Sequence, residues 1–241
     1  MKTYFKIVWL ILLLLISVCA VACKRFEAPV ASKNAVIVPN AERGQHSLYV
    51  ALGDSTGVGM GAHDRGGYVD NLLLRINRNG SKAELINVCA AGASIHDVLE
   101  KQASRLAKLR PTLVTLSVGS NDLLQETQVE HFARDYEDVV IRIKRTCNVV
   151  VITNIPSLSS APGLPPQVRN SVRQRTLTFN RSIAEIAERY GLPLFDLYSV
   201  SESLALHPEF FSADGVHPSD RGYEFWAEAM WPLVEEAINR S

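Results

Sequence analysis

The feature that most constrains this sequence is a regular alternation, after residue 47, of short apolar runs with segments whose apolar residues recur at helical spacing. The sequence predicts five strands, at residues 48–52, 85–88, 113–118, 149–153 and 193–197. Strands that are apolar on both faces, joined through helices, are typical of a parallel sheet that is covered on both sides. The sequence therefore predicts one three-layer α/β domain over residues 48–241.

Local signals mark where the helices between these strands begin and end. The segment 68–78 carries apolar residues at helical spacing. Ser94, with Asp97 three residues later, predicts a capped helix. Gly191 ends the helix before the fifth strand, and the last helix follows Ser219.

The composition excludes several classes of protein. The chain has 25 Lys and Arg residues against 25 Asp and Glu residues, whereas a nucleic-acid-binding domain usually carries a basic excess. Because 47% of its residues are apolar and 21% are charged, the chain can bury a core. Four cysteines are too few for a disulfide scaffold. We expect no nucleic-acid partner.

The N-terminal segment, residues 1–22, predicts export. Two lysines precede an uncharged apolar stretch, 7–22, which ends in the small residues Ala20-Val21-Ala22 before Cys23. Ala-Val-Ala-Cys resembles the lipoprotein box of bacteria, although Ala20 stands where such boxes more often carry Leu. We expect an exported protein anchored to a membrane by a lipid on Cys23. A periplasmic or secreted protein and an uncleaved membrane anchor are the alternatives.

Residues 23–47 are expected to form a tether between this signal and the domain. They mix charged residues with Pro, Asn and Gly and show no sustained helical or strand period. Such a spacer would hold a domain clear of a membrane surface.

The loop after the first strand carries a serine in an ambiguous glycine-rich setting. Gly53-Asp54-Ser55-Thr56-Gly57 satisfies the G-x-S-x-G pattern of a nucleophilic serine. Gly57-Val58-Gly59-Met60-Gly61-Ala62 satisfies the dinucleotide-binding pattern G-x-G-x-x-A. Ser55-Thr56-Gly57 is also similar to the phosphate loop of flavodoxins, so this loop alone leaves three alternatives open.

Three further loops follow strands, and ligands of parallel α/β sheets bind at the carboxyl ends of the strands. Gly92 would present a bare backbone N–H just before a capped helix, and Asn121 could donate a hydrogen bond from its side-chain amide. Asp214 and His217 lie three residues apart in a predicted turn, where an acid can orient an imidazole. The other five histidines show no ligand spacing around His217, so we expect no metal site.

The four loops are consistent with one reaction, acyl transfer. Ester hydrolysis needs a nucleophile, a base, a group that orients the base, and an oxyanion hole. Ser55 would be the nucleophile, His217 the base and Asp214 the orienting acid. The N–H groups of Ser55 and Gly92 and the side chain of Asn121 would form the oxyanion hole. A dinucleotide site would need neither Asn121 nor the Asp214 and His217 pair. It would favour an acid at the end of the second strand, which is absent there.

Together these blocks resemble the SGNH, or GDSL, hydrolase family. The matching residues are Gly53-Asp54-Ser55, Gly92, Gly119-Ser120-Asn121-Asp122 and Asp214-Gly215-Val216-His217. The resemblance implies a flavodoxin-like sheet of five parallel strands in the order 2-1-3-4-5. It also implies a serine hydrolase of esters or thioesters that uses no cofactor, with Ser55, Asp214 and His217 as catalytic residues and Ser55, Gly92 and Asn121 as the oxyanion hole.

The chain departs from the family pattern in two places, which affects the expected shape of the acyl pocket. Thr56-Gly57 replaces the more common Leu or Ile after the serine, and Cys89 and Ala91 stand where Gly and Ser are frequent. The general α/β-hydrolase fold is disfavoured because its serine follows a mid-chain strand. Loops 154–171 and 198–213 are expected to wall a pocket for a small or medium acyl ester, although ordinary packing explains their apolar residues equally well.

We therefore expect an exported serine esterase or lipase, with a lipid or glycan ester as the substrate. The alternative from another class is an exported module that binds a glycan or lipid on the same fold without turnover. A flavin or nucleotide protein that uses residues 53–62 is a third possibility.

The implied strand order also bears on two of the cysteines. Cys89 follows the second strand and Cys147 precedes the fourth, so two strands separate them. The gap is roughly 14 Å at about 4.8 Å per strand, whereas a disulfide needs Cα atoms within about 7 Å. We expect both thiols to be free.

Overall fold

The architecture is described here from a computed structural model that covers residues 47–64, 66–78 and 82–240. These residues belong to one compact unit, Gly44–Ser241. The expected signal at 1–22, Cys23 and the expected tether up to residue 46 lie outside the described residues. None of the helices in the described ranges is long and apolar enough to cross a membrane.

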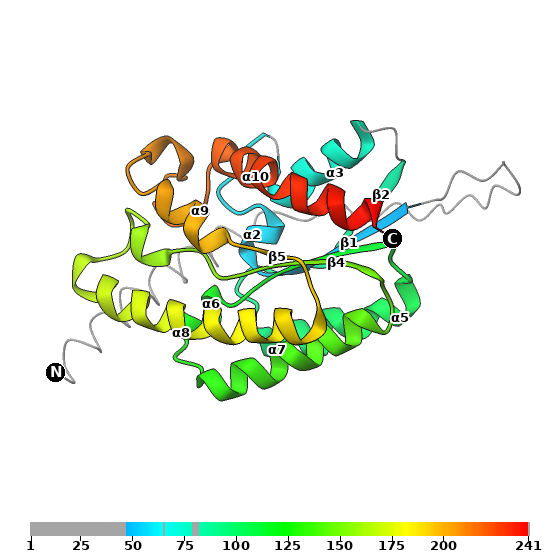
Figure 1. Cartoon of the computed structure of the whole chain (residues 1–241). Helices are drawn as coiled ribbons and strands as arrows, with labels where there is room; N and C mark the ends of the chain where they lie inside the picture. The colour runs from blue at the N-terminus through cyan, green and yellow to red at the C-terminus, as the bar shows by residue number, and fades with distance from the viewer. Residues whose placement is uncertain (1–46, 65, 79–81, 241) are drawn as a thin grey trace, which may run out of the picture. The chain divides into compact units, whose positions relative to one another are not determined.

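A single five-stranded sheet forms the middle layer of this unit (Figure 1). All neighbouring strands pair in parallel, and the order is β2-β1-β3-β4-β5. The strands are β1 (Ser47–Gly53), β2 (Ala83–Asn87), β3 (Leu113–Ser117), β4 (Val149–Thr153) and β5 (Leu194–Phe195). The expected fold class and strand order are therefore confirmed, and β1 lies between β2 and β3.

Helices cover both faces of the sheet, α3 and α10 on one face and α7 and α8 on the other (Figure 1). Long helices of this kind form the crossovers that parallel strands require. The described helices are α2 (Ser55–Val58), α3 (Tyr68–Arg78), α4 (Ile95–Asp97), η1 (Val98–Gln102), η2 (Ala103–Arg105), α5 (Leu106–Leu109), α6 (Ser120–Leu124), α7 (Val129–Lys144), η3 (Leu158–Ser160), α8 (Pro166–Tyr190), α9 (Leu197–Ser203), η4 (Pro208–Phe210) and α10 (Asp220–Asn239).

The alternation of side chains along each strand divides the interior into two cores. On one face, Val50 and Leu52 of β1 pack with residues of α7 and α8 such as Phe132 and Phe179. On the other face, Tyr49 and Ala51 pack with residues of α3 and α10. The strands are thus buried on both sides, as their apolar sequences predict.

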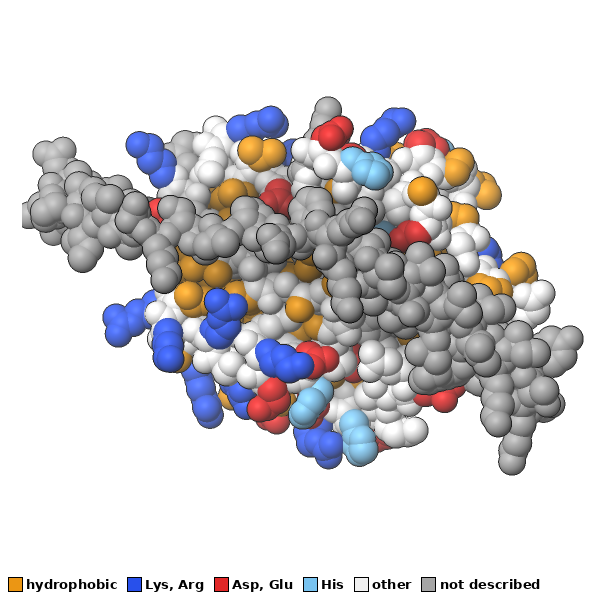
Figure 2. All heavy atoms as spheres, turned by 180° about the vertical axis from the view of Figure 1, so that it is seen from behind, with side chains coloured by type: hydrophobic (Ala, Val, Ile, Leu, Met, Phe, Trp, Pro, Cys, Tyr) orange, Lys and Arg blue, Asp and Glu red, His pale blue; other side chains and the backbone are white. Residues whose placement is uncertain are grey.

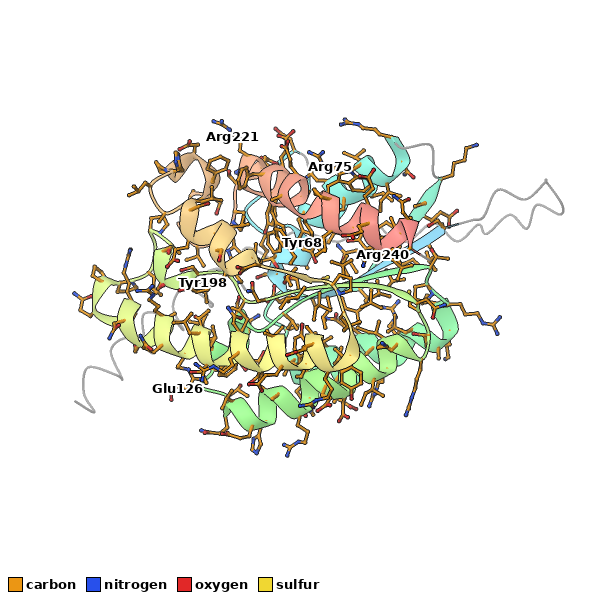
Figure 3. The ribbon with its side chains drawn as sticks, in the orientation of Figure 1. Tyr68, Arg75, Glu126, Tyr198, Arg221 and Arg240 are labelled. Carbon is orange, nitrogen blue, oxygen red and sulfur yellow. The ribbon has the colours of Figure 1, made fainter. Side chains whose placement is uncertain are left out.

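Aromatic stacking joins α3 to α10 in the second core. The rings of Tyr68 and Trp226 stack with their centroids 4.3 Å apart. Figure 3 shows Tyr68 in the interior, beneath α10. This contact holds α10 against α3, and the loop that enters α10 carries Asp214 and His217.

The surface of the domain mixes charges of both signs. On the face seen in Figure 2, Lys and Arg side chains lie among Asp, Glu and His side chains of the described residues. This agrees with the equal numbers of basic and acidic residues in the chain.

The structure differs from the predicted elements in three places. The helix expected behind Ser94 is irregular: a π-helical turn, η1, follows α4 and precedes a 3-10 turn and α5. The loop expected at 154–171 is shorter, because α8 begins at Pro166. The strand expected at 193–197 is reduced to two residues, since Asp196 already caps α9 with its side chain.

Cys89 and Cys147 are free thiols. Cys147 is buried next to β4, whereas Cys89 lies against the turn that carries Ser55. A Cβ atom added to Gly57 would come within 2.3 Å of Cys89 Sγ. The small residue at 57 is therefore required by the sulfur atom behind it.

This contact generates a prediction of paired substitutions. We expect Gly57→Ala to lower the free energy of unfolding by about 1–3 kcal/mol, because an added methyl group overpacks the interior. Combining it with Cys89→Ala, which removes the sulfur, should restore part of that loss. Urea unfolding of the wild type, both single variants and the double variant measures the coupling. Simple additivity of the two losses would contradict the contact.

Candidate active site

The serine at position 55 stands at the start of a helical turn directly after β1. Asp54 caps this turn: its Oδ1 accepts hydrogen bonds from Thr56 N (3.0 Å) and from Thr56 Oγ1 (2.9 Å). The first N–H groups of a helix have no partner within the helix, so the N–H of Ser55 remains available as a donor. Burial raises the pKa of the Asp54 carboxyl, and the hydrogen bonds from Thr56 oppose that effect.

Three of the predicted site residues form a continuous hydrogen-bonded chain. Ser55 Oγ lies 3.0 Å from His217 Nε2, and His217 Nδ1 lies 2.6 Å from Asp214 Oδ2. The serine and the histidine are 162 residues apart in sequence and meet because β1 ends beside the turn that enters α10. This geometry is that of a nucleophile, its base and the acid that orients the base.

The carboxylate of Asp214 is held in its ionised form. Partial burial would raise its pKa, but hydrogen bonds from His217 Nδ1, the N–H groups of Val216 and His217, and the Ser212 hydroxyl outweigh this and lower the pKa to about 2. An ionised carboxylate only accepts hydrogen bonds, so His217 Nδ1 carries the proton. His217 Nε2 is then free to accept the proton of Ser55.

Two residues that the sequence did not single out hold this turn in place. Ser212 donates through its hydroxyl to Asp214 Oδ1 (2.8 Å), and its N–H donates to the carbonyl of His217 (2.8 Å). Gly163 donates its N–H to the carbonyl of Gly215 (2.8 Å). A Cβ on Gly163 would lie 2.6 Å from the carbonyl oxygen of Asp214, so only glycine permits this approach. The contact of Gly163 is formed by tertiary packing and has no local sequence signal, whereas that of Ser212 lies within the turn itself.

The remaining predicted donors lie on the two loops that follow β2 and β3. Gly92 adopts a φ of +77°, which favours glycine, and its N–H has no acceptor among the described residues. The Asn121 side chain donates one amide hydrogen to the carbonyl of Ala93 (3.0 Å) and keeps a second one free. This bond ties the loop of Asn121 to that of Gly92. Asn121 itself lies in α6, where the sequence predicted an irregular loop.

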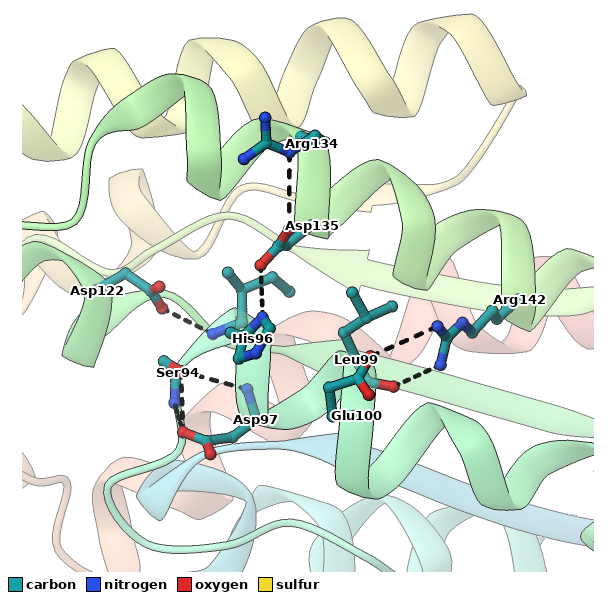
Figure 4. A network of polar contacts seen from close by, with 10 residues as sticks. Ser94, His96, Asp97, Leu99, Glu100, Asp122, Arg134, Asp135 and Arg142 are labelled. Carbon is teal, nitrogen blue, oxygen red and sulfur yellow. Dashed lines mark hydrogen bonds and ion pairs between the residues drawn. The ribbon is translucent and has the colours of Figure 1, made fainter.

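A buried carboxyl beneath these loops joins them more firmly. Asp122 Oδ2 accepts a hydrogen bond from the N–H of Ile95 (2.9 Å), the first residue of α4 (Figure 4). Ser94 and Asp97 form the expected capping box around the same helix start. Burial raises the pKa of Asp122 to about 6, although the hydrogen bond from Ile95 acts in the opposite direction.

A cavity of about 90 Å³ opens beside Ser55 and His217. Its walls are mainly apolar and come from three regions, the segment after β4, the segment from α9 to η4, and the start of α10. The apolar lining residues include Leu158, Val200, Leu204, Phe210, Phe211 and Trp226. The cavity walls thus come largely from the loops 154–171 and 198–213, as the sequence predicted.

Some expected wall residues do not contribute. Leu206 is 89% exposed, and Pro162, Pro165 and Pro166 do not line the cavity. Trp226, which belongs to the second core, also reaches the cavity. Within the described ranges, no group of three or more His, Cys, Asp or Glu residues could hold a metal ion.

The buried Asp122 generates a pH prediction. Its folded pKa of about 6 exceeds the ordinary value of 3.8, so its ionisation destabilises the folded protein as pH rises. Asp122→Asn keeps an acceptor for the Ile95 N–H but cannot ionise. Between pH 4 and pH 7 the wild type should therefore lose up to about 3 kcal/mol of unfolding free energy relative to this variant. Urea unfolding of both proteins at several pH values tests this, and parallel stability curves would refute it.

Other proteins resemble this chain in sequence and structure. It is 24% identical over 192 residues to the GDSL-like esterase Rv1075c of Mycobacterium tuberculosis, a match that covers 78% of this chain and 61% of that protein. It is 23% identical over 145 residues to the isoamyl acetate-hydrolyzing esterase 1 homolog of Bos taurus, covering 54% of this chain and 58% of the relative. The chain thus spans about three fifths of the length of these two relatives.

A solved structure and a family profile agree with these matches. The lipase/acylhydrolase from Enterococcus faecalis superimposes with a TM-score of 0.63 and 24% identity, covering 80% of this chain and 96% of that one. The profile of the GDSL-like lipase/acylhydrolase family matches residues 51–225, a range that contains all four loops of the site. The chain therefore belongs to the GDSL-like lipase/acylhydrolase family.

Proposed function

We propose that this protein hydrolyses carboxylic esters or thioesters through an acyl intermediate on Ser55. The observation that carries the proposal is the hydrogen-bonded chain from Asp214 through His217 to Ser55, with distances of 2.6 and 3.0 Å. A serine hydroxyl is a weak nucleophile unless a neighbouring base removes its proton, and this chain supplies that base.

Acylation begins when Ser55 Oγ attacks the acyl carbon of the ester. His217 Nε2 takes the hydroxyl proton as the new C–O bond forms, and Asp214 stabilises the resulting imidazolium. The tetrahedral intermediate then expels the alcohol, or the thiol of a thioester, which takes the proton from His217. Water, activated by the same histidine, attacks the acyl-enzyme, and the acid leaves as Ser55 regains its proton.

Three donors would stabilise the negative charge of the tetrahedral oxygen. The N–H of Ser55 lies at a helix start, the N–H of Gly92 has no acceptor among the described residues, and Asn121 has a free amide hydrogen. Such donors act where charge develops and are already oriented before the reaction. The bond from Asn121 to the Ala93 carbonyl keeps the second and third donors together.

The size and chemistry of the cavity favour an ester with a small or medium apolar group. Its volume of about 90 Å³ accommodates roughly six to nine water-sized groups at about 10–15 Å³ each. Its few polar lining groups include the hydroxyls of Ser120, Ser157 and Ser201. Such a wall binds an acyl or alkyl chain through burial of apolar surface.

The place of action remains a proposal from the sequence. The apolar segment 7–22 followed by Cys23 supports export and anchoring by a lipid. On an exported protein, the tether at 23–47 would carry the domain away from the membrane, within reach of lipid or glycan esters.

A fluorophosphonate tests the function without a choice of substrate. We expect the full-length protein to gain one phosphonyl group on Ser55, detected by intact and peptide mass. Ser55→Ala should gain none, and His217→Ala should react at a rate lower by orders of magnitude. No adduct on folded wild-type protein would contradict the proposal and support the alternative of a non-catalytic binding module.

The oxyanion donors and the orienting acid should have separable effects on turnover. Asn121→Ala should lower kcat by about 10²–10³-fold, the usual effect of one lost donor. Asp214→Asn should lower kcat by up to about 10⁴-fold, because an amide no longer holds His217 in the required tautomer. Hydrolysis of p-nitrophenyl butyrate measures both. Rates near that of the wild type for both variants would show that these roles are misassigned.

A further inference from the structure

A buried side-chain amide holds the end of β1 just before the serine. Gly53 donates its N–H to Gln102 Oε1 (2.9 Å), and its carbonyl accepts a hydrogen bond from Gln102 Nε2 (2.9 Å). Gln102 is 3% exposed and lies 49 residues from Gly53 in sequence. Buried amides are costly unless both of their polar ends are paired, and here the oxygen and the nitrogen each have a partner in Gly53.

The amide occupies the position where a neighbouring strand has ended. The carbonyls of Ala51 and Gly53 accept hydrogen bonds from Val88 N and Ala90 N, so both residues face the β2 side. Because β2 ends at Asn87, the N–H of Gly53 lies beyond the last strand pair on that side. A carboxamide carries the same donor and acceptor as a peptide group, so Gln102 continues the pairing for one more residue.

The backbone around Gln102 is unusual in a way that favours this contact. Gln102 ends the π-helical turn η1, in which Ala103 N bonds to the Val98 carbonyl across five residues. Such turns contain one more residue than a regular helical turn and are frequent at functional sites. In this wide turn, Gln102 is buried and its side chain reaches Gly53 of β1.

The contact is connected to both halves of the site. Gly53 precedes Asp54, whose N–H donates to Ser117 on β3 (3.3 Å), and Asp54 caps the turn of Ser55. The carbonyl of Gly53 is shared by Gln102 and by Ala90, two residues before Gly92. Through Gly53, the Gln102 side chain is therefore linked both to the strand that precedes the nucleophile and to the loop that carries a predicted oxyanion donor.

We propose that Gln102 is a positioning residue that sets the place of Ser55 relative to Gly92 and His217. The inference rests on the ester hydrolysis proposed above and adds a residue outside its catalytic set. Gln102 touches no reacting atom, so its loss should affect how often the site is correctly aligned rather than how well the ester binds.

The chain provides a matched control in Asn180 of α8. Asn180 Nδ2 donates to the carbonyl of Ile155 (2.9 Å), and Ile155 N donates to Asn180 Oδ1 (2.8 Å). This is the same two-bond contact at the end of β4, a strand that carries no predicted catalytic residue. Substitutions at Asn180 remove an equivalent pair of bonds next to a wall of the cavity, and so report lost stability and a disturbed wall without a change at β1.

The first experiment compares Gln102→Leu with Asn180→Leu in the full-length protein. We expect Gln102→Leu to lower kcat for p-nitrophenyl butyrate by roughly 10–100-fold, as small misplacements of reacting groups do, with KM changed by less than about threefold. The rate constant for phosphonylation of Ser55 should fall in parallel. Asn180→Leu should keep that rate constant within about twofold.

The second experiment uses Gln102→Glu and remains informative if Gln102→Leu fails to fold. A protonated Glu reproduces both hydrogen bonds to Gly53, whereas an ionised Glu presents an oxygen to the Gly53 carbonyl and repels it. Burial raises the pKa of a carboxyl, so the Glu side chain should change from protonated to ionised within the range of pH in which activity can be measured. The activity of Gln102→Glu relative to wild type should therefore fall as pH rises from 5 to 8.

The other charged groups near Gln102 are the same in the wild type and in Gln102→Glu. Asp54 follows β1, and the elements packed against η1 include α4 with Asp97, η2 with Arg105 and α7 with Arg142. Arg142 donates to the carbonyl of Leu99 and pairs with Glu100, as Figure 4 shows. Because both proteins carry these groups, division by the wild-type rate at each pH removes the pH dependence that the two proteins share. Asn180→Asp, treated in the same way, should show no comparable fall.

The outcomes separate this inference from the proposed function. If the wild type is labelled and Gln102→Leu is phosphonylated within twofold of the wild-type rate, the positioning role alone is overturned. An equal loss in Asn180→Leu, or a flat pH ratio for Gln102→Glu, would overturn it as well. A wild type that is not labelled at all would overturn the proposed function, and this inference with it.

Discussion

The close approach of β1 to β3 at Gly53 is the constraint on which the rest of the site depends. A Cβ atom at Gly53 would lie 2.2 Å from the carbonyl oxygen of Ser117, so only glycine permits the two strands to end this close together. The next N–H, that of Asp54, donates to the same oxygen. The chain then turns at once into α2, and Ser55 emerges at the carboxyl edge of the sheet, where the other three loops also arrive.

Burial raises the pKa of both carboxyl groups, Asp214 and Asp122, and the number of hydrogen bonds that each accepts decides whether this effect prevails. Asp214 accepts from four donors and its pKa falls to about 2, so the group beside the histidine stays charged. Asp122 accepts from Ile95 in a buried position and its pKa rises to about 6. The first carboxyl therefore orients a base, whereas the second secures a helix start and carries little charge below about pH 5, one unit under its pKa.

The sequence predicted what depends on local pattern. The strand runs gave the sheet, and the glycine, serine and histidine motifs placed Ser55, Asp214 and His217 on loops that the structure brings together. It did not predict the contacts that form only after folding. Gly163 and Gln102 act through residues 52 and 49 positions away. Gln102 carries no motif, and its π-helical turn has no counterpart in the periodicity of apolar residues.

The backbone conformation at Gly92 determines which residues this position accepts, according to their chirality. Its φ of +77° is disfavoured for L-residues, yet a Cβ atom built on it would meet nothing within 4 Å. There is therefore room for a side chain at position 92, and only the backbone conformation restricts which residue can occupy it. A mirror-image residue, which prefers positive φ, would keep this loop relaxed, whereas an L-alanine of the same size would strain it. The requirement at this position is therefore one of backbone conformation rather than of side-chain volume.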